Sequence, residues 1–513
     1  MPARDRPPVA GSIHSPRLQP AAAAGAPTER EIQSVFVGLM IVNGLGALDQ
    51  SIVATALPRI VSELGGLNHL AWVVTAYVLA STSVMPLYGK LSDHFGRKPM
   101  IYVAVLTFLA GSMLCGLAQN LTQLIVFRAV QGLGAGGLLP LSQITIGDLL
   151  PPARRGSKQG SIAAVFAACS VVGPVLGGVI TTVLSWHWIF YINLPVGALA
   201  LYMIARALRR PHVRRDTPID YLGAMLLTGA TTAFLLVLSL GGSEWAWDSA
   251  PIAVCAALAL ALAGAFIVHA RNNRDAVLPL DLFGDRLFRI ACIVLALTFM
   301  GLLGASVFFP LFFQLVMGVS PGHSGLLTSP LMIGVVISSI YNGRVLLRSG
   351  RYKPAQVGGL SIATAAFAVL AWSISTAQGL VAIESAIFFL GLGLGLVMPN
   401  MTIAVQNKLP AARRGVGTAT LAFARSLGGL VGVTGSGAIV NWQLRSFERS
   451  GGLAGDALRA VAEGGLRQSG VLTPEVIAVY RHALATTFFL GACIVALALL
   501  AIQFLPEHPL KTE

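Results

Sequence analysis

The chain alternates between long apolar runs and short polar segments. Fourteen of the runs reach about 20 residues, the length that an α-helix needs to cross the hydrocarbon core of a bilayer. This pattern predicts an all-α membrane protein with 14 transmembrane helices, and the even number places both termini on one side. The predicted spans cover residues 35–57, 70–88, 100–118, 122–147, 160–183, 188–205, 220–240, 250–269, 288–315, 325–343, 355–375, 380–406, 415–440 and 483–505.

Composition favours a membrane protein over a soluble one. Of the 513 residues, 55% are apolar and only 11% are charged, whereas a soluble domain has roughly 25% charged residues. The five cysteines all fall within predicted spans and form no CxxC pair. They are therefore interpreted as small buried residues, without a disulfide framework or a metal site.

The net charge of +14 follows from where Lys and Arg lie along the chain. With a cytoplasmic N-terminus, twenty-seven of the 35 Lys and Arg fall in cytoplasmic segments and six in outer segments. Positively charged loops favour the cytoplasmic side. Both termini are therefore predicted to be cytoplasmic, in the cell (inner) membrane, and the charge requires no nucleic acid partner.

An internal repeat links the two ends of the chain. Residues 132–156, GLGAGGLLPLSQITIGDLLPPARRG, align without a gap to residues 391–415, GLGLGLVMPNMTIAVQNKLPAARRG, at an offset of 259. Twelve of the 25 positions are identical, and both segments end in PxARRG. The matched segments are the fourth and twelfth spans and run in the same direction, so the repeat is parallel.

The repeat predicts two six-helix halves with two extra central helices between them. Parallel halves of this kind form transporters whose substrate site lies between the halves and whose access alternates by rocking. The predicted divisions are a disordered cytoplasmic tail (1–33), an N-terminal half (34–210), a two-helix insert (211–275), a C-terminal half (276–505) with a long outer loop (441–482), and a cytoplasmic tail (506–513).

Four motifs resemble those of a known transporter family. They are LDQSIVATALPRI (48–60), GKLSDHFGRK (89–98), LIVFRAVQGLGAG (124–136) and CSVVGPVLGG (169–178). Together they resemble the major facilitator superfamily, and more closely its fourteen-span drug:proton antiporters of the EmrB/QacA type. The resemblance implies the major facilitator fold and proton-coupled export of hydrophobic or cationic compounds, with multidrug efflux and antibiotic resistance as the biological outcome.

The resemblance implies that residues 89–98 form a conformational latch. Gly89 and Gly96 suit tight turns and close helix approach. Asp93 is expected to meet the N-terminal end of a helix in the other half, where the helix dipole favours an anion. Arg97 is expected to pair with an acid such as Asp148. The alternative is a plain turn whose charges only set the topology.

The span 5 motif resembles the one that marks exporters within the superfamily. Gly173 and Pro174 permit a bend because proline removes a backbone hydrogen bond. Gly177 and Gly178 are expected to allow tight contact with the opposing half. The alternative is generic packing of small residues between helices.

Acidic and basic residues inside the predicted spans are candidates for proton coupling. Asp49 lies about 14 residues into its span, roughly 21 Å from the inner end at 1.5 Å per residue. A carboxylate at that depth is expected to be functional, as a proton carrier or as a partner of a cationic substrate, although it could also hydrogen-bond across a helix interface. Arg128 is implied to modulate the proton step, and Glu384 is a further candidate that could pair with Arg425.

The chain contains no motif for ATP hydrolysis, metal-dependent hydrolysis or serine catalysis. The sequence therefore predicts a transporter that is not an enzyme and needs no cofactor. Its expected partners are a small-molecule substrate, protons and membrane lipid, with a periplasmic adaptor protein as a further candidate. Export of a specific metabolite, lipid or fatty acid stays open as an alternative, as does an uptake symporter.

Overall fold

The computed structural model describes residues 29–64, 70–207, 219–242, 245–273, 275–449 and 474–506. Within these ranges the regular structure is helical and contains no β-strand. The first helices are α1 (Glu29–Leu64), α2 (Leu70–Phe95), α3 (Arg97–Gly116), α4 (Leu121–Leu149), α5 (Pro152–Val183), α6 (Trp188–Tyr191), α7 (Asn193–Ala207), α8 (Tyr221–Leu240) and α9 (Ala250–Asn272). The later ones are α10 (Arg286–Ser306), α11 (Phe308–Leu315), α12 (Pro321–Leu327), α13 (Ser329–Ser349), α14 (Lys353–Ser375), α15 (Leu380–Lys408), α16 (Arg414–Arg449) and α18 (Pro474–Gln503). Two short 3₁₀ turns, Leu280–Gly284 and Ala411–Arg413, precede α10 and α16.

Twelve helices in the described ranges are long and apolar enough to cross a membrane. They have the length and the low charge that a helix needs in hydrocarbon, where every backbone polar group must be satisfied within the segment. The helices α2 and α5, of 26 and 32 residues, are not among these twelve. The protein is thus a multi-pass membrane protein, and the number fourteen stays a prediction.

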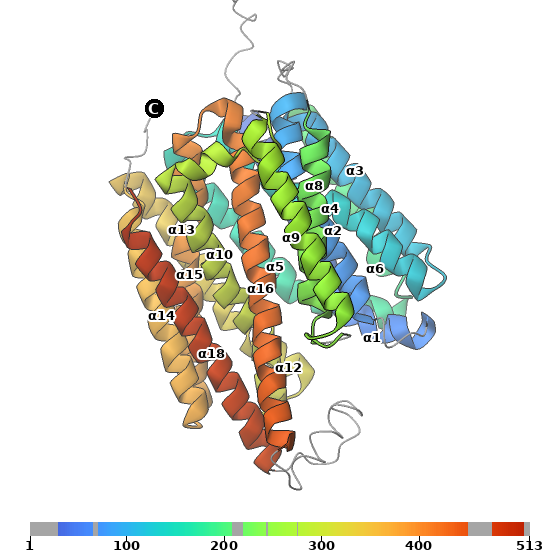
Figure 1. Ribbon diagram of the computed structural model, residues 1–513, viewed down its shortest axis with the longest axis vertical. Coiled ribbons are helices and arrows are strands. Elements are labelled where there is room, and N and C mark those ends of the chain that lie inside the picture. The colour runs from blue at the N-terminus through green and yellow to red at the C-terminus, as the bar shows by residue number, and fades with distance from the viewer. Residues whose placement is uncertain are drawn as a thin grey trace, which may run out of the picture.

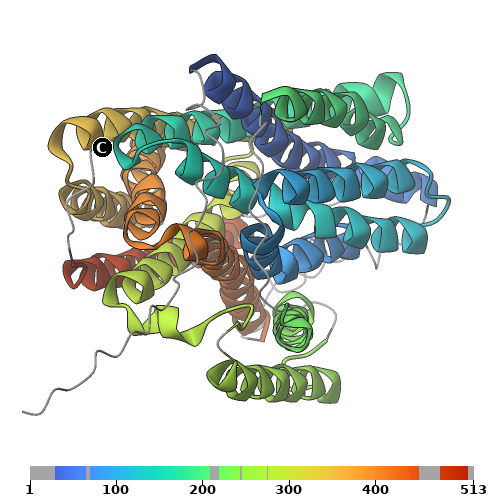
Figure 2. The same cartoon turned by 90° about the horizontal axis from the view of Figure 1, so that it is seen from above.

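The apolar side chains gather in two separate groups of helices. One set of core residues lies between Val35 and Ile204, in the helices α1 to α7, which we call the N-terminal bundle. A second set lies between Leu282 and Leu505 and belongs to α10 to α18, the C-terminal bundle. Figures 1 and 2 show the two bundles side by side, with α8 and α9 along one flank.

Helices α8 and α9 are joined to each other at one end through Asp220. Asp220 caps α8 by accepting from the Gly223 N–H at 2.9 Å, and it also accepts from the Val277 N–H at 3.1 Å. His269 of α9 lies 2.7 Å from the same carboxylate. Burial alone raises the pKa of Asp220, but these hydrogen bonds outweigh burial and hold the pKa below its ordinary value.

The two bundles touch at the side of the molecule that carries Asp93, here called the latch side. There α2 approaches α16, since a Cβ added at Gly89 would lie 2.8 Å from the Gly415 carbonyl oxygen. There α5 also approaches α13, since a Cβ added at Gly160 would lie 3.1 Å from the Ser339 carbonyl oxygen. Residues without side chains permit backbones to approach this closely.

The repeat in the sequence appears as two matching helices. Helices α4 and α15 each contain 29 residues, and both their first and last residues are separated by 259 positions. Each carries one internal proline, Pro140 and Pro399, at the same position of the repeat. Each bundle therefore contains one copy of this repeated helix.

Two predicted loop segments are shorter than the sequence suggested. Residues 29–33 belong to α1 and not to a disordered tail, while 1–28 lie outside the described residues. Of the predicted loop at 441–482, residues 441–449 continue α16 and residues 474–482 begin α18. The reason is that all three helices extend past their apolar stretches, which the hydropathy pattern alone does not reveal.

Candidate transport site and closing contacts

Asp49 and Arg128 form an ion pair in the interior of the N-terminal bundle. Asp49 lies in α1 and Arg128 in α4, with Arg128 Nη1 2.7 Å from Asp49 Oδ2. The Arg128 side chain is 1% exposed and the Asp49 side chain 0%. Arg128 therefore does not reach outward to water, and each charge is tolerated at this depth because the other is present.

Three further side chains complete what we call the Asp49 network. Gln131 of α4 donates to Asp49 Oδ1 at 2.8 Å, and Asn193 of α7 donates to the same oxygen at 2.9 Å. Asn193 Nδ2 also donates to Ser112 of α3, while Arg128 Nη1 donates to the side-chain oxygen Oε1 of Gln131 at 2.7 Å. Three helices of one bundle, α1, α4 and α7, thus meet at a single carboxylate, and Ser112 of α3 supports Asn193 from behind.

Helix α2 lies against the Asp49 network. The guanidinium of Arg128 lies 4.1 Å from the centre of the Tyr77 ring, and its Nε donates to the Val73 carbonyl at 3.3 Å. The adjacent face of α2, with Val74 and Val78, lines a cavity between the bundles. The network is therefore sealed, yet only one helix separates it from the space between the bundles.

Glu384 and Arg425 are not brought together. Glu384 lies half-buried near the start of α15 and forms no ion pair with Arg425. Arg425 in α16 instead lies 4.9 Å from the centre of the Phe299 ring, in a cation–π contact. The pair considered from the sequence is therefore absent from the structure.

Asp93 crosses from one bundle to the other. It lies near the end of α2, and its carboxylate accepts hydrogen bonds from the backbone N–H of Gly415 at 3.2 Å and of Val416 at 2.9 Å. These are the first N–H groups of α16, which have no partner within the helix and lie at the positive end of its dipole. Asp93 thus caps a helix of the C-terminal bundle.

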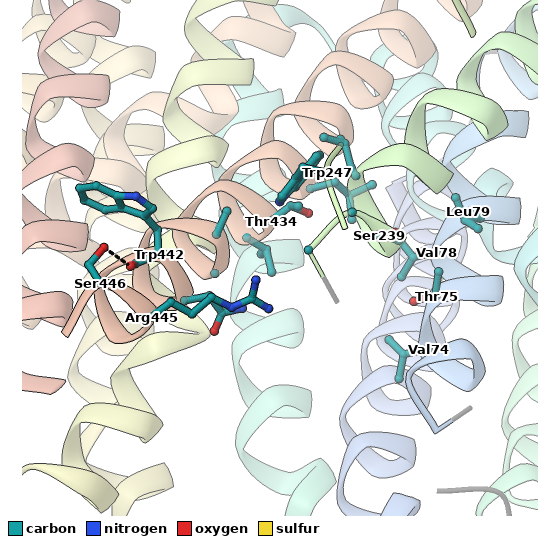
Figure 3. A pocket seen from close by; sticks show the side chains of 18 residues that line it. Val74, Thr75, Val78, Leu79, Ser239, Trp247, Thr434, Trp442, Arg445 and Ser446 are labelled. Carbon is teal, nitrogen blue, oxygen red and sulfur yellow. Dashed lines mark hydrogen bonds between the residues drawn. The ribbon is translucent and has the colours of Figure 1, made fainter. Parts of the chain in front are cut away.

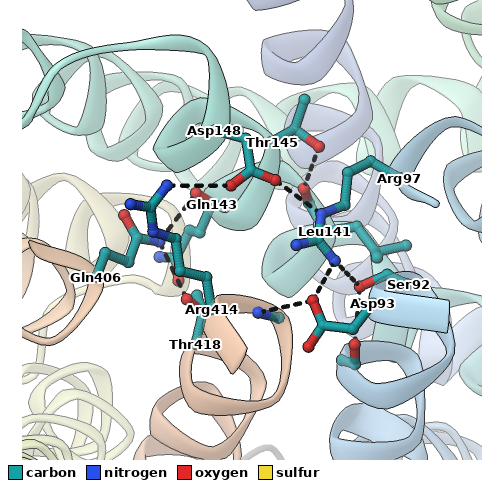
Figure 4. A network of polar contacts seen from close by, with 12 residues as sticks. Ser92, Asp93, Arg97, Leu141, Gln143, Thr145, Asp148, Gln406, Arg414 and Thr418 are labelled. Carbon is teal, nitrogen blue, oxygen red and sulfur yellow. Dashed lines mark hydrogen bonds and ion pairs between the residues drawn. The ribbon is translucent and has the colours of Figure 1, made fainter. Parts of the chain in front are cut away.

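Arg97 joins Asp93 to a second carboxylate (Figure 4). Its Nη1 lies 2.7 Å from Asp93 Oδ1, and its Nε lies 2.8 Å from Asp148 Oδ2. Arg414 of the C-terminal bundle lies 3.6 Å from the other Asp148 oxygen. The chain of alternating charges therefore runs from α2 through α3 and α4 to α16.

Gly96 permits the sharp turn between α2 and α3. Its φ of 97° lies in the region that favours glycine. Gly89, one helical turn before Asp93, packs directly on α16, and a Cβ there would clash with Ala419. Both glycines therefore serve the geometry that places Asp93 and Arg97.

We expect Gly89→Val to weaken closure on the latch side. Overpacking a tight contact costs about 1–3 kcal/mol, enough to reduce the ratio of closed to open molecules about tenfold. Chemical cross-linking of a Cys pair introduced at Gly160 and Ser339, with the native cysteines replaced, measures this closure. Gly178→Val serves as control, because a Cβ at Gly178 meets nothing within 4 Å. Equal cross-linking in both variants would contradict the expectation.

A second contact between the bundles was missed by the sequence analysis. Gln406 of α15 donates to the Gln143 carbonyl of α4 and to Thr418, both at 3.1 Å. A Cβ added at Gly147 would lie 2.6 Å from Gln406 Oε1, so the Gln406 side chain occupies the space beside this glycine. Position 147 aligns with position 406 in the repeat, so the two equivalent positions face each other across the interface.

The span 5 motif was expected to contact the opposing bundle through its glycines, but in the structure Gly173 and Gly177 contact α1 of their own bundle. A Cβ at Gly173 would clash with Ser51 of α1, and one at Gly177 would lie 3.0 Å from the Ile52 carbonyl oxygen. Gly178 faces open space. The motif, with Pro174 inside α5, therefore brings α5 close to α1 within its own bundle, because α1 presents the small Ser51, which donates to the Cys169 carbonyl at 3.1 Å.

Away from the latch side, a cavity of about 490 Å³ separates the bundles (Figure 3). It is lined by α2, by α16 and by the connection between α8 and α9. Among the residues that the structure describes, no group of three His, Cys, Asp or Glu could hold a metal ion. The polar architecture is thus one buried ion pair, a set of closing contacts and a cavity between two helical bundles.

Two helical bundles that touch on one side and enclose a cavity towards the other define a secondary membrane transporter. The chain belongs to the Major Facilitator Superfamily, whose family model matches residues 39–433. The protein is accordingly a transporter and not an enzyme.

Curated relatives of this chain are named as transporters, and a solved structure shares its fold. The chain is 39% identical over 424 residues to "Multidrug transporter protein MdtP" of Bacillus subtilis, covering 83% of this chain and 77% of the relative. It is 33% identical to "Multidrug resistance protein 3" of the same organism, covering 93% and 96%. The human organic anion transporter MFSD10 has a similar fold, with a TM-score of 0.62 at 13% identity, covering 92% of this chain and 99% of that one.

Proposed function

We propose that the protein is a proton-coupled exporter that exchanges protons for hydrophobic or cationic compounds. The observation that carries the proton-coupling part is the fully buried ion pair between Asp49 and Arg128. An ionisable pair inside a membrane bundle is expensive, and its usual use is in proton or substrate movement. The direction of transport is supported by the two bacterial relatives, which are named as multidrug proteins.

In this proposal the ion pair alternates between closed and open arrangements. When the bundles rock, helix α2 moves with the interface and loosens the cover that Tyr77 and Val73 place on Arg128. An unpaired carboxylate in hydrocarbon is costly, so Asp49 takes up a proton as Arg128 withdraws. Re-forming the pair releases the proton. Arg128 thus modulates the step, and Glu384 is a second candidate carrier.

The contacts of Asp93, Arg97 and Asp148 act in this proposal as the latch that holds one end state. Gly89 and Gly96 position the latch, and the motif from Gly173 to Gly177 sets the fit of α5 on α1. Rocking then breaks the α16 cap on one side while the cavity closes on the other.

We further propose fourteen spans, with α2 and α5 crossing the membrane beside the twelve apolar helices. Two six-helix halves and the α8–α9 insert follow from this division. The latch side and both termini face the cytoplasm of an inner membrane, supported by the excess of Lys and Arg there. A periplasmic adaptor protein is a candidate partner on the opposite side.

The test is pH-gradient-driven transport of ethidium in inverted membrane vesicles. We expect Asp49→Asn to reduce coupled transport at least about 100-fold, because an amide carries no exchangeable charge for the proton. Asp248→Asn, in the exposed connection between α8 and α9, is the matched control and should transport normally. Intact coupling in a folded Asp49→Asn protein would assign Asp49 a structural role. Absence of transport of any dye by the wild type would remove the multidrug part of the proposal.

A further inference from the structure

The cavity between the bundles has an unusual third wall. Beside α2 and α16, it is lined by the end of α8 and by Trp247 in the connection to α9. Figure 3 shows Trp247 and Ser239 entering from the side opposite Trp442 and Arg445. The end of α8 and the connection to α9 therefore contribute directly to the surface that a transported molecule meets.

Trp247 is held in place by its own connection. Its ring packs on Gly241, where an added Cβ would lie 2.6 Å from the ring, and on Gly242, whose φ is +76°. The turn is closed by hydrogen bonds from Gly242 N–H to the Trp245 carbonyl at 2.7 Å and from Trp245 N–H to the Leu240 carbonyl at 3.0 Å. A fixed aromatic side chain that is 47% exposed offers a flat apolar surface at low entropic cost.

The charge of the lining comes from one residue. Of the described residues that line the cavity, Arg445 is charged and the others are apolar or neutral polar. Its side chain extends from α16 toward α2 (Figure 3). It forms no ion pair or hydrogen bond with another described residue, and it is exposed. An unpaired guanidinium above apolar walls attracts anions and repels cations, because the walls focus its field.

We propose that this cavity binds amphipathic anions, that is, small carboxylates or sulfonates with an aromatic or aliphatic body. Arg445 pairs with the anionic group, and Trp247 packs against the apolar body. The inference rests on the proposed export, and it predicts that the cavity binds an anionic compound more tightly than a cationic compound with the same apolar body. It also makes Trp247 of the insert a residue that determines specificity.

Equilibrium binding to the purified full-length protein in lipid nanodiscs tests the proposal without any proton gradient. The probes are radiolabelled 2-naphthoate and 2-naphthyltrimethylammonium, which share one aromatic body and differ in charge. We expect naphthoate to bind more tightly than the cation. Arg445→Gln should weaken naphthoate binding about tenfold, since a charge-assisted contact is lost, and Arg445→Lys should retain most of it.

Arg59→Gln is the matched control, because Arg59 is an exposed arginine outside the cavity lining that pairs with Glu63. Its naphthoate affinity should equal that of the wild type. Tighter binding of the cation than of naphthoate, or equal naphthoate affinity in Arg445→Gln and wild type, would overturn the proposal. A monodisperse size-exclusion profile for each variant shows that any loss of naphthoate binding is not caused by misfolding.

Trp247→Ala should weaken naphthoate binding about fivefold, because an aromatic contact contributes modestly beyond the area it buries. Trp372→Ala is its control, since Trp372 is an exposed tryptophan of α14 outside the cavity. Equal losses in both variants would remove the insert from the site.

The binding assay separates this inference from the proposed export. Arg445-dependent naphthoate binding in a protein that transports nothing against a pH gradient leaves the site in place and removes the export proposal. If the protein transports ethidium against a pH gradient but binds naphthoate equally well with and without Arg445, the anion site is disproved and the export proposal is retained.

Discussion

Arg128→Met is expected to lower the free energy of unfolding by about 3–5 kcal/mol, the cost of leaving one member of a buried ion pair uncompensated. Asp49 would then be a fully buried acid without a cationic partner, and Gln131 and Asn193 would be its remaining hydrogen-bond donors. Denaturant unfolding in detergent, followed by circular dichroism, measures the change. Arg59→Met is the control, because Arg59 and Glu63 form an exposed pair that contributes about 1 kcal/mol or less.

The double variant Asp49→Leu with Arg128→Met provides the sharper part of this test. Removing both charges leaves no buried charge, so we expect it to be less destabilised than the sum of the two single variants by about 2 kcal/mol or more. Recovery should be partial, because Gln131 and Asn193 lose an acceptor. Strictly additive losses would contradict a direct energetic coupling between Asp49 and Arg128.

Asp93→Ala is expected to open the latch side. The substitution removes the cap on α16, which crosses between the bundles and stabilises closure by about 1–3 kcal/mol. It also removes the ion pair with Arg97 that positions Asp93 within its own bundle. The open population should rise about tenfold or more. The reporter is Ala422→Cys in a background without the native cysteines, since Ala422 is 2% exposed and packs on Met85 across the interface. Its rate of maleimide labelling measures opening.

Asp281→Asn is the control for the latch, because Asp281 pairs with Arg413 on the exposed surface of the same side. In the Asp281→Asn variant, the cysteine at position 422 should be labelled at the wild-type rate. If Asp93→Ala labels no faster than this control, the contact between Asp93 and α16 does not hold the two bundles together.

The sequence predicted those features that depend on pattern and on local motifs. Apolar runs predicted the helices, and the repeat predicted equivalent helices such as α4 and α15. Asp93 was expected at the N-terminal end of a helix in the other half because anions favour such ends. The structure identifies that helix as α16, through Gly415 and Val416.

Contacts that depend on helix rotation were not predictable from one chain. Whether Gly173 and Gly177 face α1 or the other bundle depends on a rotation that the apolar pattern of a helix surrounded by protein and lipid leaves undetermined. Asn193 joined Asp49 although 144 residues separate them. Gln131 left a usable signal, because it lies three residues after Arg128 and therefore on the same helical face.

Gly147 and Gln406 face each other across the interface, and this limits how the sequences of two duplicated halves can diverge. In an assembly of two identical halves, a residue on the symmetry axis meets its own copy. Two glycines there leave a hole, and two glutamines compete for one space. This chain has the small Gly147 at one position and the large Gln406 at the other, which fill the space together. A substitution at one of them therefore requires a compensating substitution at the other. The C-terminal half therefore supplies the side chain at this contact and the N-terminal half supplies the space for it, a difference that two identical halves could not have.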